Sequence, residues 1–190
     1  MSFDIVEDTL IALTKEKLTN SAGQAVYQAV EAVPGDLDDA DTIKEMVKVA
    51  PSVYWAFLGG RPGVDSSDIV AFNGVWVAFM VVQHAGDYMA RLRGDTTTIG
   101  LYEMTATLLP EVNGYTIAGV GTMKFRRLQN LFRMNMDKTG VQVYAASFEL
   151  QQSFEPAAGA LDGFITYHAE HSMAPGTDEP AAVDDLTLDQ

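Results

Sequence analysis

The chain has 190 residues, of which 47% are hydrophobic and 20% charged, so we expect one domain with a sizeable core rather than a disordered protein. It contains no cysteine, which excludes disulfides, thiol catalysis, cysteine-ligated zinc and iron–sulfur clusters. The net charge of −14 argues against a protein that holds DNA or an anionic membrane through its average field. The N-terminus lacks the basic segment of a signal peptide, and the longest apolar run, residues 75–82, is too short to span a bilayer.

The charge is unevenly distributed along the chain. Residues 91–138 contain seven of the twelve basic residues and four acidic ones. Residues 155–190 contain eight acidic residues and no lysine or arginine. A basic middle and an acidic C-terminal segment can attract each other, either within one subunit or between subunits.

The first 50 residues predict helix, strand and helix. An apolar stripe at helical spacing, formed by Val6, Leu10 and Leu13, predicts an N-terminal amphipathic helix. Residues 25–33 are compatible with a strand or a helix, and we favour a strand because a Pro-Gly-Asp turn follows it. A short second helix is expected to run to about residue 49, where Pro51 stops it.

Two strongly apolar runs, residues 52–58 and 75–83, are rich in β-branched and aromatic residues and lack polar alternation. This composition is typical of central strands that are covered on both faces. The glycine-rich residues 59–63 are interpreted as a turn, because no Lys-Ser/Thr pair follows as a phosphate-binding loop requires.

The next segment is expected to be a polar loop that carries Arg91 and Arg93. Thr98 can cap a third helix that reaches about Leu109, and Pro110 would end it.

Residues 123–128 alternate as a strand with one solvated face, and residues 137–140 favour a type I turn that closes a hairpin. The second arm, residues 141–151, places four core side chains on one face: Tyr144, Ala146, Phe148 and Leu150. We therefore predict an α+β fold with one mixed, largely antiparallel sheet of about five strands packed with two to three helices. This domain should cover residues 1–154, and residues 155–190 should form an acidic, extended C-terminal arm.

No motif nominates a catalytic residue, so we predict a protein that is not an enzyme and has no cofactor or metal site. The one hint of a metal site is His168 and His171, which would share a face if their segment were helical. Their spacing departs from the zinc-protease motif, and a small metal-dependent hydrolase is kept only as a remote alternative.

Basic residues and methionines are the better candidates for a surface that contacts a partner or another subunit. Lys124 and Arg126 alternate onto one face of the predicted strand, although charges on an edge strand also serve to prevent aggregation. The candidate interface residues are Arg91, Arg93, Lys124, Arg126, Arg127, Arg133, Met134 and Met136.

Several stretches together resemble the tail-terminator-like family of Mu-like bacteriophages. They are IVEDTLIALTKEKL, AVEAVPGDLD, VKVAPSVYWAFLGGRP, VWVAFMVVQ and RLQNLFRMNMDKTGVQVYAASFELQQSF, whose order and spacing match over about residues 3–154. Residues 155–190 resemble the ends of the longer family members, which share an LDGFITYHAEHSMAPG-like stretch and an acidic terminus.

The resemblance implies a structural virion protein that acts through interfaces and not through catalysis. Such proteins form a ring, usually a hexamer, on the last ring of the tail tube; they stop polymerisation and present a surface for head joining. The implied partners are other copies of the chain, the tail tube protein, in some phages the sheath protein, and a head-completion or neck protein. DNA would pass through the ring without specific binding, no membrane is involved, and the location would be the head-proximal end of the tail after assembly in the host cytoplasm. A head-completion or neck connector subunit of the same type of phage is the main alternative.

Overall fold

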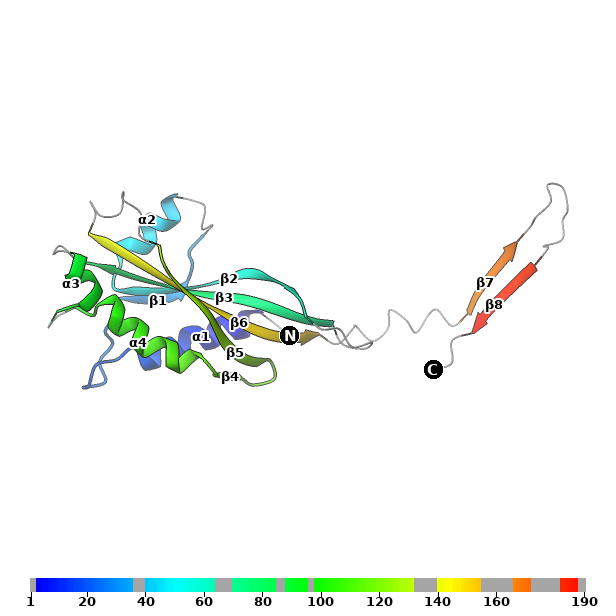
Figure 1. Cartoon of the computed structure of the whole chain (residues 1–190), viewed down its shortest axis with the longest axis horizontal. Helices are drawn as coiled ribbons and strands as arrows, with labels where there is room; N and C mark the ends of the chain where they lie inside the picture. Colours follow the sequence, from blue (N-terminus) through cyan, green and yellow to red (C-terminus); the bar gives the residue numbers. More distant parts are fainter. Residues whose placement is uncertain are drawn as a thin grey trace. The chain divides into compact units, whose positions relative to one another are not determined.

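A computed structural model describes residues 3–35, 40–63, 70–84, 88–95, 98–131, 140–154, 166–171 and 182–187. The chain divides into two compact units, residues 1–154 and 155–190 (Figure 1). The described elements of the first unit are α1 (Phe3–Lys17), β1 (Ala29–Ala32), α2 (Ala40–Lys48), β2 (Ser52–Pro62), β3 (Val70–Gln83), α3 (Tyr88–Arg93), α4 (Leu101–Val112), β4 (Thr116–Ile117), β5 (Gly121–Asn130) and β6 (Val141–Phe154). Those of the second unit are β7 (Thr166–His171) and β8 (Ala182–Thr187).

The first unit is built on one curled sheet with the strand order β1-β2-β3-β6-β5-β4. Strands β1 and β2 run parallel, and the other neighbouring pairs are antiparallel. The two longest strands, β3 and β6, lie at the centre and pair from Val70 opposite Phe154 to Gln83 opposite Val141. The predicted α+β fold with a mixed, largely antiparallel sheet is confirmed, and the sixth strand is the two-residue β4.

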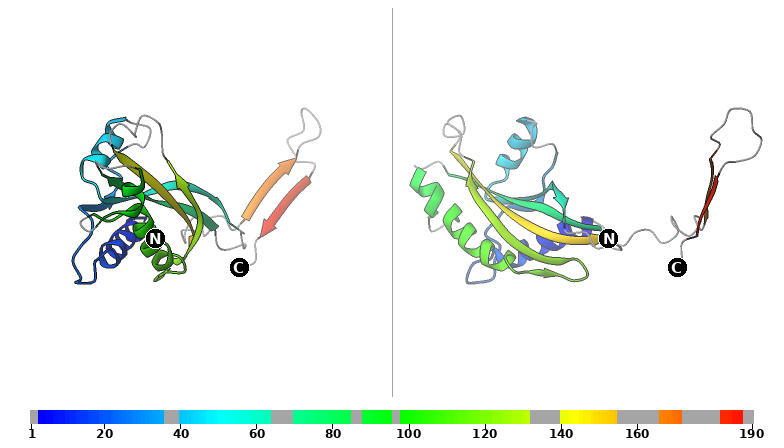
Figure 2. Two further views of the ribbon diagram at one scale, coloured as in Figure 1. Left: turned by 60° about the vertical axis from the view of Figure 1, so that its left-hand side comes forward. Right: turned by 45° about the vertical axis from the view of Figure 1, so that its right-hand side comes forward.

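Helices α1 and α4 cover one face of this sheet, and α3 packs beside them against α4 and β6 (Figure 2). The predicted stripe of α1 is buried there, together with Trp55 of β2 and Phe148 of β6. A buried chain of hydrogen bonds joins helix to sheet. The Trp55 indole N–H donates to the Thr14 hydroxyl over 3.0 Å, and this hydroxyl donates to the Leu10 carbonyl over 2.7 Å. The four side chains predicted to share one face of β6 all belong to this core.

The opposite face of the sheet has a second, smaller core. Helix α2 contributes Met46, which is buried with Tyr54 of β2 and Phe79 of β3. In Figure 1, α2 lies over one end of the sheet only. The rest of this face is not covered by any described helix, and this uncovered part is the candidate site.

Three sequence predictions about the segment before β4 are wrong. Arg91 and Arg93 lie in helix α3 and not in a polar loop. Thr98 does not cap α4, which begins after Gly100; the Thr98 backbone N–H donates instead to the Asp95 carboxylate. Pro110 lies inside α4 rather than after it.

The physical reason for the last correction is burial. A proline removes one backbone hydrogen bond from a helix, which disfavours continuation. Leu108 and Val112, on either side of Pro110, are both fully buried in the main core. Tertiary packing therefore extends the helix through a residue that local propensity would use to end it.

In the second unit, β7 and β8 form a two-stranded antiparallel sheet, from Thr166 opposite Thr187 to His171 opposite Ala182. The hypothetical shared helix face of His168 and His171 does not exist, because both lie in a strand. No described helix is long and apolar enough to cross a membrane.

Candidate interaction face

The candidate site is the part of the second sheet face that α2 leaves uncovered, which we call the open face. Antiparallel partners point to the same side of a sheet, so the register defines its members. They are Arg61 of β2, Asn73 and Val75 of β3, Lys124 and Arg127 of β5, and Ser147, Glu149 and Gln151 of β6. Arg126 of β5 has no partner in this register, and its hydrogen bond to Glu149 places its guanidinium on the same face.

A β-bulge in β5 gathers its basic residues on this face. Lys124 lies opposite Glu149, and Arg127 lies opposite Ser147, while the register shifts between Phe125 and Arg127. In a regular strand, residues 124 and 127 would point to opposite faces. The extra residue in the bulge restores the alternation, so both side chains belong to the open face.

Glu149 organises the cations around it. Its two carboxylate oxygens accept hydrogen bonds from the Arg126 guanidinium over 2.9 Å and from the Arg61 guanidinium over 3.5 Å. The three residues come from β5, β6 and β2, so the contacts reach across four neighbouring strands. Both arginine side chains are largely exposed, whereas that of Glu149 is mostly buried.

The electrostatics of the open face are positive. The hydrogen bond from Arg126 lowers the pKa of the Glu149 carboxyl below its ordinary value, and the charges of Arg126 and Arg61 act in the same direction. Glu149 is therefore ionised at neutral pH and offsets one positive charge. Four basic residues against one carboxylate leave a basic surface on a chain whose net charge is −14.

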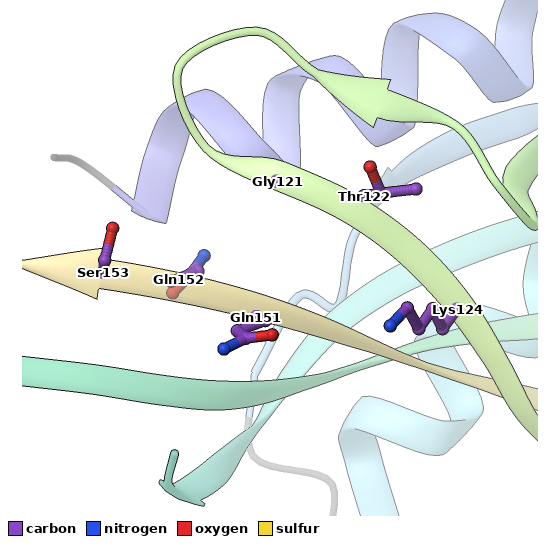
Figure 3. Close-up of a pocket in the computed structure, with 6 residues that line it drawn as sticks. All are labelled: Gly121, Thr122, Lys124, Gln151, Gln152 and Ser153. Carbon is purple, nitrogen blue, oxygen red and sulfur yellow. The ribbon is translucent and has the colours of Figure 1, made fainter. Parts of the chain in front are cut away.

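An open hollow of about 390 Å³ adjoins this surface where β5 and β6 run side by side (Figure 3). Its lining residues are Gly121, Thr122, Lys124, Gln151, Gln152 and Ser153. Gln152 is only 1% exposed, and neither its amide nitrogen nor its amide oxygen has a hydrogen-bond partner among the described residues. Gln152 alternates onto the helix-covered face with Leu150, so Lys124 and the exposed Gln151 are the lining residues that the hollow shares with the open face.

The other side of β5 carries exposed apolar groups. Phe125 is 36% exposed and Leu128 39% exposed, although the Phe125 ring lies against that of Phe148, with 5.8 Å between the centroids. Tyr88 and Tyr102, from α3 and α4, are also exposed on the helix side. Aromatic residues are enriched at protein interfaces. Strand β5 therefore presents a charged side and an apolar side to the solvent.

The predicted interface residues fall into three groups. Lys124, Arg126 and Arg127 lie together on the open face, and Arg93 is exposed at the end of α3. Arg91 is only 4% exposed and its guanidinium lies 6.0 Å from the centre of the Tyr88 ring, which is a cation–π distance. The remaining candidates, Arg133, Met134 and Met136, lie outside the described residues.

The sequence pattern alone does not indicate Arg61, Glu149 or the hollow as parts of a site. Arg61 was assigned to a turn, because the glycines before it suggest one, but β2 continues through it to Pro62. Alternation along β6 puts Glu149 on the face of the sheet that is opposite to the face of its neighbour Phe148. This alternation is the signal that could have identified Glu149 as a partner for basic residues on a neighbouring strand. Within the described part of the chain, no cluster of three or more His, Asp or Glu side chains is arranged to hold a metal ion.

These features define an α+β protein in which helices cover one face of the sheet and the other face is partly uncovered and basic. The family model described as Bacteriophage Mu, Gp37 matches residues 5–153, so the chain belongs to that family of bacteriophage proteins. The resemblance to a Mu-like phage family is confirmed.

One relative is the Mu-like prophage FluMu protein gp37 of Haemophilus influenzae. It is 29% identical over 124 residues, which cover 65% of this chain. The same match covers 58% of the relative's own length. Among solved structures, a chain from the virion of a native gene transfer agent particle aligns with 80% of this chain and with all of its own length, at 13% identity and a TM-score of 0.44.

Proposed function

We propose that the protein is a structural component of the phage particle that forms a ring on the last ring of the tail tube. The ring ends polymerisation of the tube and provides the surface to which the head is joined. Membership of the Bacteriophage Mu, Gp37 family over residues 5–153 carries this proposal. The exposed, two-sided strand β5 supports it, because a ring subunit needs surfaces that remain available after folding.

The mechanism is the matching and mismatching of surfaces. A tube grows because each ring offers the next ring an unsatisfied complementary surface. A terminator matches that surface on one side and presents a different surface on the other, so a further tube ring finds no partner. In a closed ring, each subunit also binds its neighbours through two different patches. The basic open face and the apolar side of β5, with Phe125 and Leu128, are two such patches.

The proposed partners follow from this position in the particle. They are other copies of the chain, the tail tube protein with the sheath protein as a further candidate, and a head-completion or neck protein. We propose the exposed basic residues Arg93, Lys124, Arg126 and Arg127 as interface residues; Arg91 is buried within the subunit and is better placed to position α3. DNA would pass through the ring without a specific contact, and the protein would catalyse no reaction.

Inactivation of the gene in an inducible prophage tests the proposal. The tail lengths of released particles are then measured by electron microscopy, with the intact prophage and a complemented strain as controls. A terminator predicts tails of abnormal and variable length that do not join to heads. Tails of normal length beside unjoined heads would instead indicate a head-completion or neck subunit. Infectious particles in normal number would contradict any essential structural role.

A further inference from the structure

We propose that the open face of one copy binds the acidic C-terminal segment, residues 178–189, of a second copy. This inference rests on the proposed ring assembly and names one of its subunit contacts. The partner is identified by charge, by the polar hollow beside the open face and by the extended backbone of β8, which lies within the segment.

Charge complementarity is the first argument. Residues 178–189 contain five carboxylates, Asp178, Glu179, Asp184, Asp185 and Asp189, and no basic residue. On the open face, Glu149 engages Arg61 and Arg126, whereas Lys124 and Arg127 have no ion-pair partner among the described residues. Two exposed cations are therefore available for carboxylates from outside the subunit.

The hollow gives the second, independent argument. The exposed Gln151 lines it from the open face, and its side-chain amide can both donate and accept hydrogen bonds. A peptide in an extended conformation carries both a donor and an acceptor on every residue and can satisfy both amide atoms. Strand β8, residues 182–187, is extended and lies within the acidic segment.

The two features are contiguous. Lys124 belongs to the open face and also lines the hollow, as does Gln151 (Figure 3). One extended acidic strand can therefore place carboxylates near Lys124 and Arg127 while its backbone reaches Gln151. A two-stranded sheet such as β7–β8 is marginally stable alone, so binding to another surface would also stabilise it.

A protein segment fits this face better than DNA does. A polyanion approaching the chain meets a net charge of −14, and the open face offers only three positive charges in excess. Nucleic-acid binding typically depends on neutralising many phosphates at once. A short acidic peptide needs fewer cations.

Cross-linking of the full-length protein tests the proposal, because the chain has no cysteine and single cysteines can be placed at will. A size-tagged Gln151→Cys chain is mixed at high concentration with an untagged Thr187→Cys chain and a short bis-maleimide. We expect a mixed dimer of the two chains. Its yield should fall several-fold in about 1 M salt, because screening shortens the reach of charge interactions to about 3 Å.

Three controls make the result specific. Ala106→Cys, at an exposed position of α4, replaces Gln151→Cys and should give little product. Arg126→Glu with Arg127→Glu should abolish the mixed dimer, and Arg126→Gln with Arg127→Gln should weaken it. Lys15→Glu with Lys48→Glu changes the net charge by the same amount as the Glu pair, at exposed helix positions, and should leave the yield unchanged. Melting curves establish that each variant is folded.

Four outcomes would overturn the inference. They are absence of the mixed dimer, an equal yield when Ala106→Cys replaces Gln151→Cys, a yield insensitive to charge reversal, and loss of the product on adding duplex DNA that itself binds the open face. The proposed function is tested separately by tail length. A salt-sensitive dimer together with normal tails would refute the terminator role and leave this contact standing, whereas abnormal tails without the dimer would do the reverse.

Discussion

The two faces of the central sheet differ in what their side chains do, although the same strands supply both. On β6, Phe148 is fully buried under the helices, while its neighbour Glu149 faces the other way and holds Arg61 and Arg126. Strands alternate their side chains, so a single sequence can encode a core and a binding surface at once. We therefore expect the helix-covered face to set the stability of the fold and the open face to set what the protein binds.

The largest effect is expected from the covered face. Phe148→Ala should lower the free energy of unfolding by about 3–5 kcal/mol, because it removes a large buried ring and leaves a cavity beside Trp55 and Phe125. Gln151→Ala, an exposed change on the same strand, is the matched control. Urea titration of both variants measures the difference, and equal effects would contradict the distinction between the two faces.

Loss of a buried hydrogen bond should lower the free energy of unfolding by less than Phe148→Ala does. Thr14→Val leaves the Trp55 indole N–H without its acceptor and should destabilise the fold by about 1–3 kcal/mol. Thr9→Val is the control, since Thr9 makes the same type of bond to the carbonyl four residues earlier at an exposed position. Denaturant midpoints compare the two. If Thr9→Val were the more damaging change, the Trp55–Thr14 bond would not be the link between α1 and the sheet.

The ion pairs of the open face should make a small, pH-dependent contribution to the free energy of unfolding. The pKa of Glu149 is lowered on folding from a reference value of 4.5, so its contribution is present above that value and lost as the pH falls through the folded-state pKa. The contribution should be below about 1 kcal/mol because both arginine partners are exposed. Glu149→Gln should flatten this part of the stability profile between about pH 6 and pH 3, where carboxylates titrate. A stability profile that is unaltered by Glu149→Gln would contradict the proposed ion cluster.

The smallest stability effect is expected at Lys124. Lys124→Ala should change the free energy of unfolding by no more than about 0.5 kcal/mol, since it is an exposed side chain without a described ion pair. The same variant should reduce assembly, measured as the fraction of tails joined to heads in a complementation experiment. Glu111→Ala, at an exposed position of α4, is the control variant for assembly. A strong loss of stability with normal assembly would reverse the assignment of the open face.

The sequence predicted those parts of the fold in which local pattern and tertiary packing agree. The stripe of α1, the two apolar central strands and the inward face of β6 all follow from periodicity. Helix α3 was missed because it is six residues long and carries two arginines, one of which is buried. Pro110 was misplaced because the burial of its neighbours is decided by the whole core and not by the local sequence.

The candidate site was predictable only in part, because it depends on register. Alternation placed Lys124 and Arg126 on one face of a strand, but Arg127 joins them only because of the bulge. The contact of Arg61 with Glu149 brings together residues 88 positions apart, and no local pattern indicates that separation. Side-chain chemistry could be anticipated from the sequence, whereas the juxtaposition of strands could not.

The central claim is that this protein is a ring subunit whose open face lies at a subunit boundary. A reconstruction of the head-proximal end of assembled tails, with the protein identified by a tag, tests it most directly. We expect a closed ring whose copy number and symmetry match those of the tube. In this ring, Lys124, Arg126 and Arg127 should be buried against a neighbouring subunit. A single copy per tail, a number of copies incompatible with the tube, or a ring in which these three side chains face solvent would contradict the account.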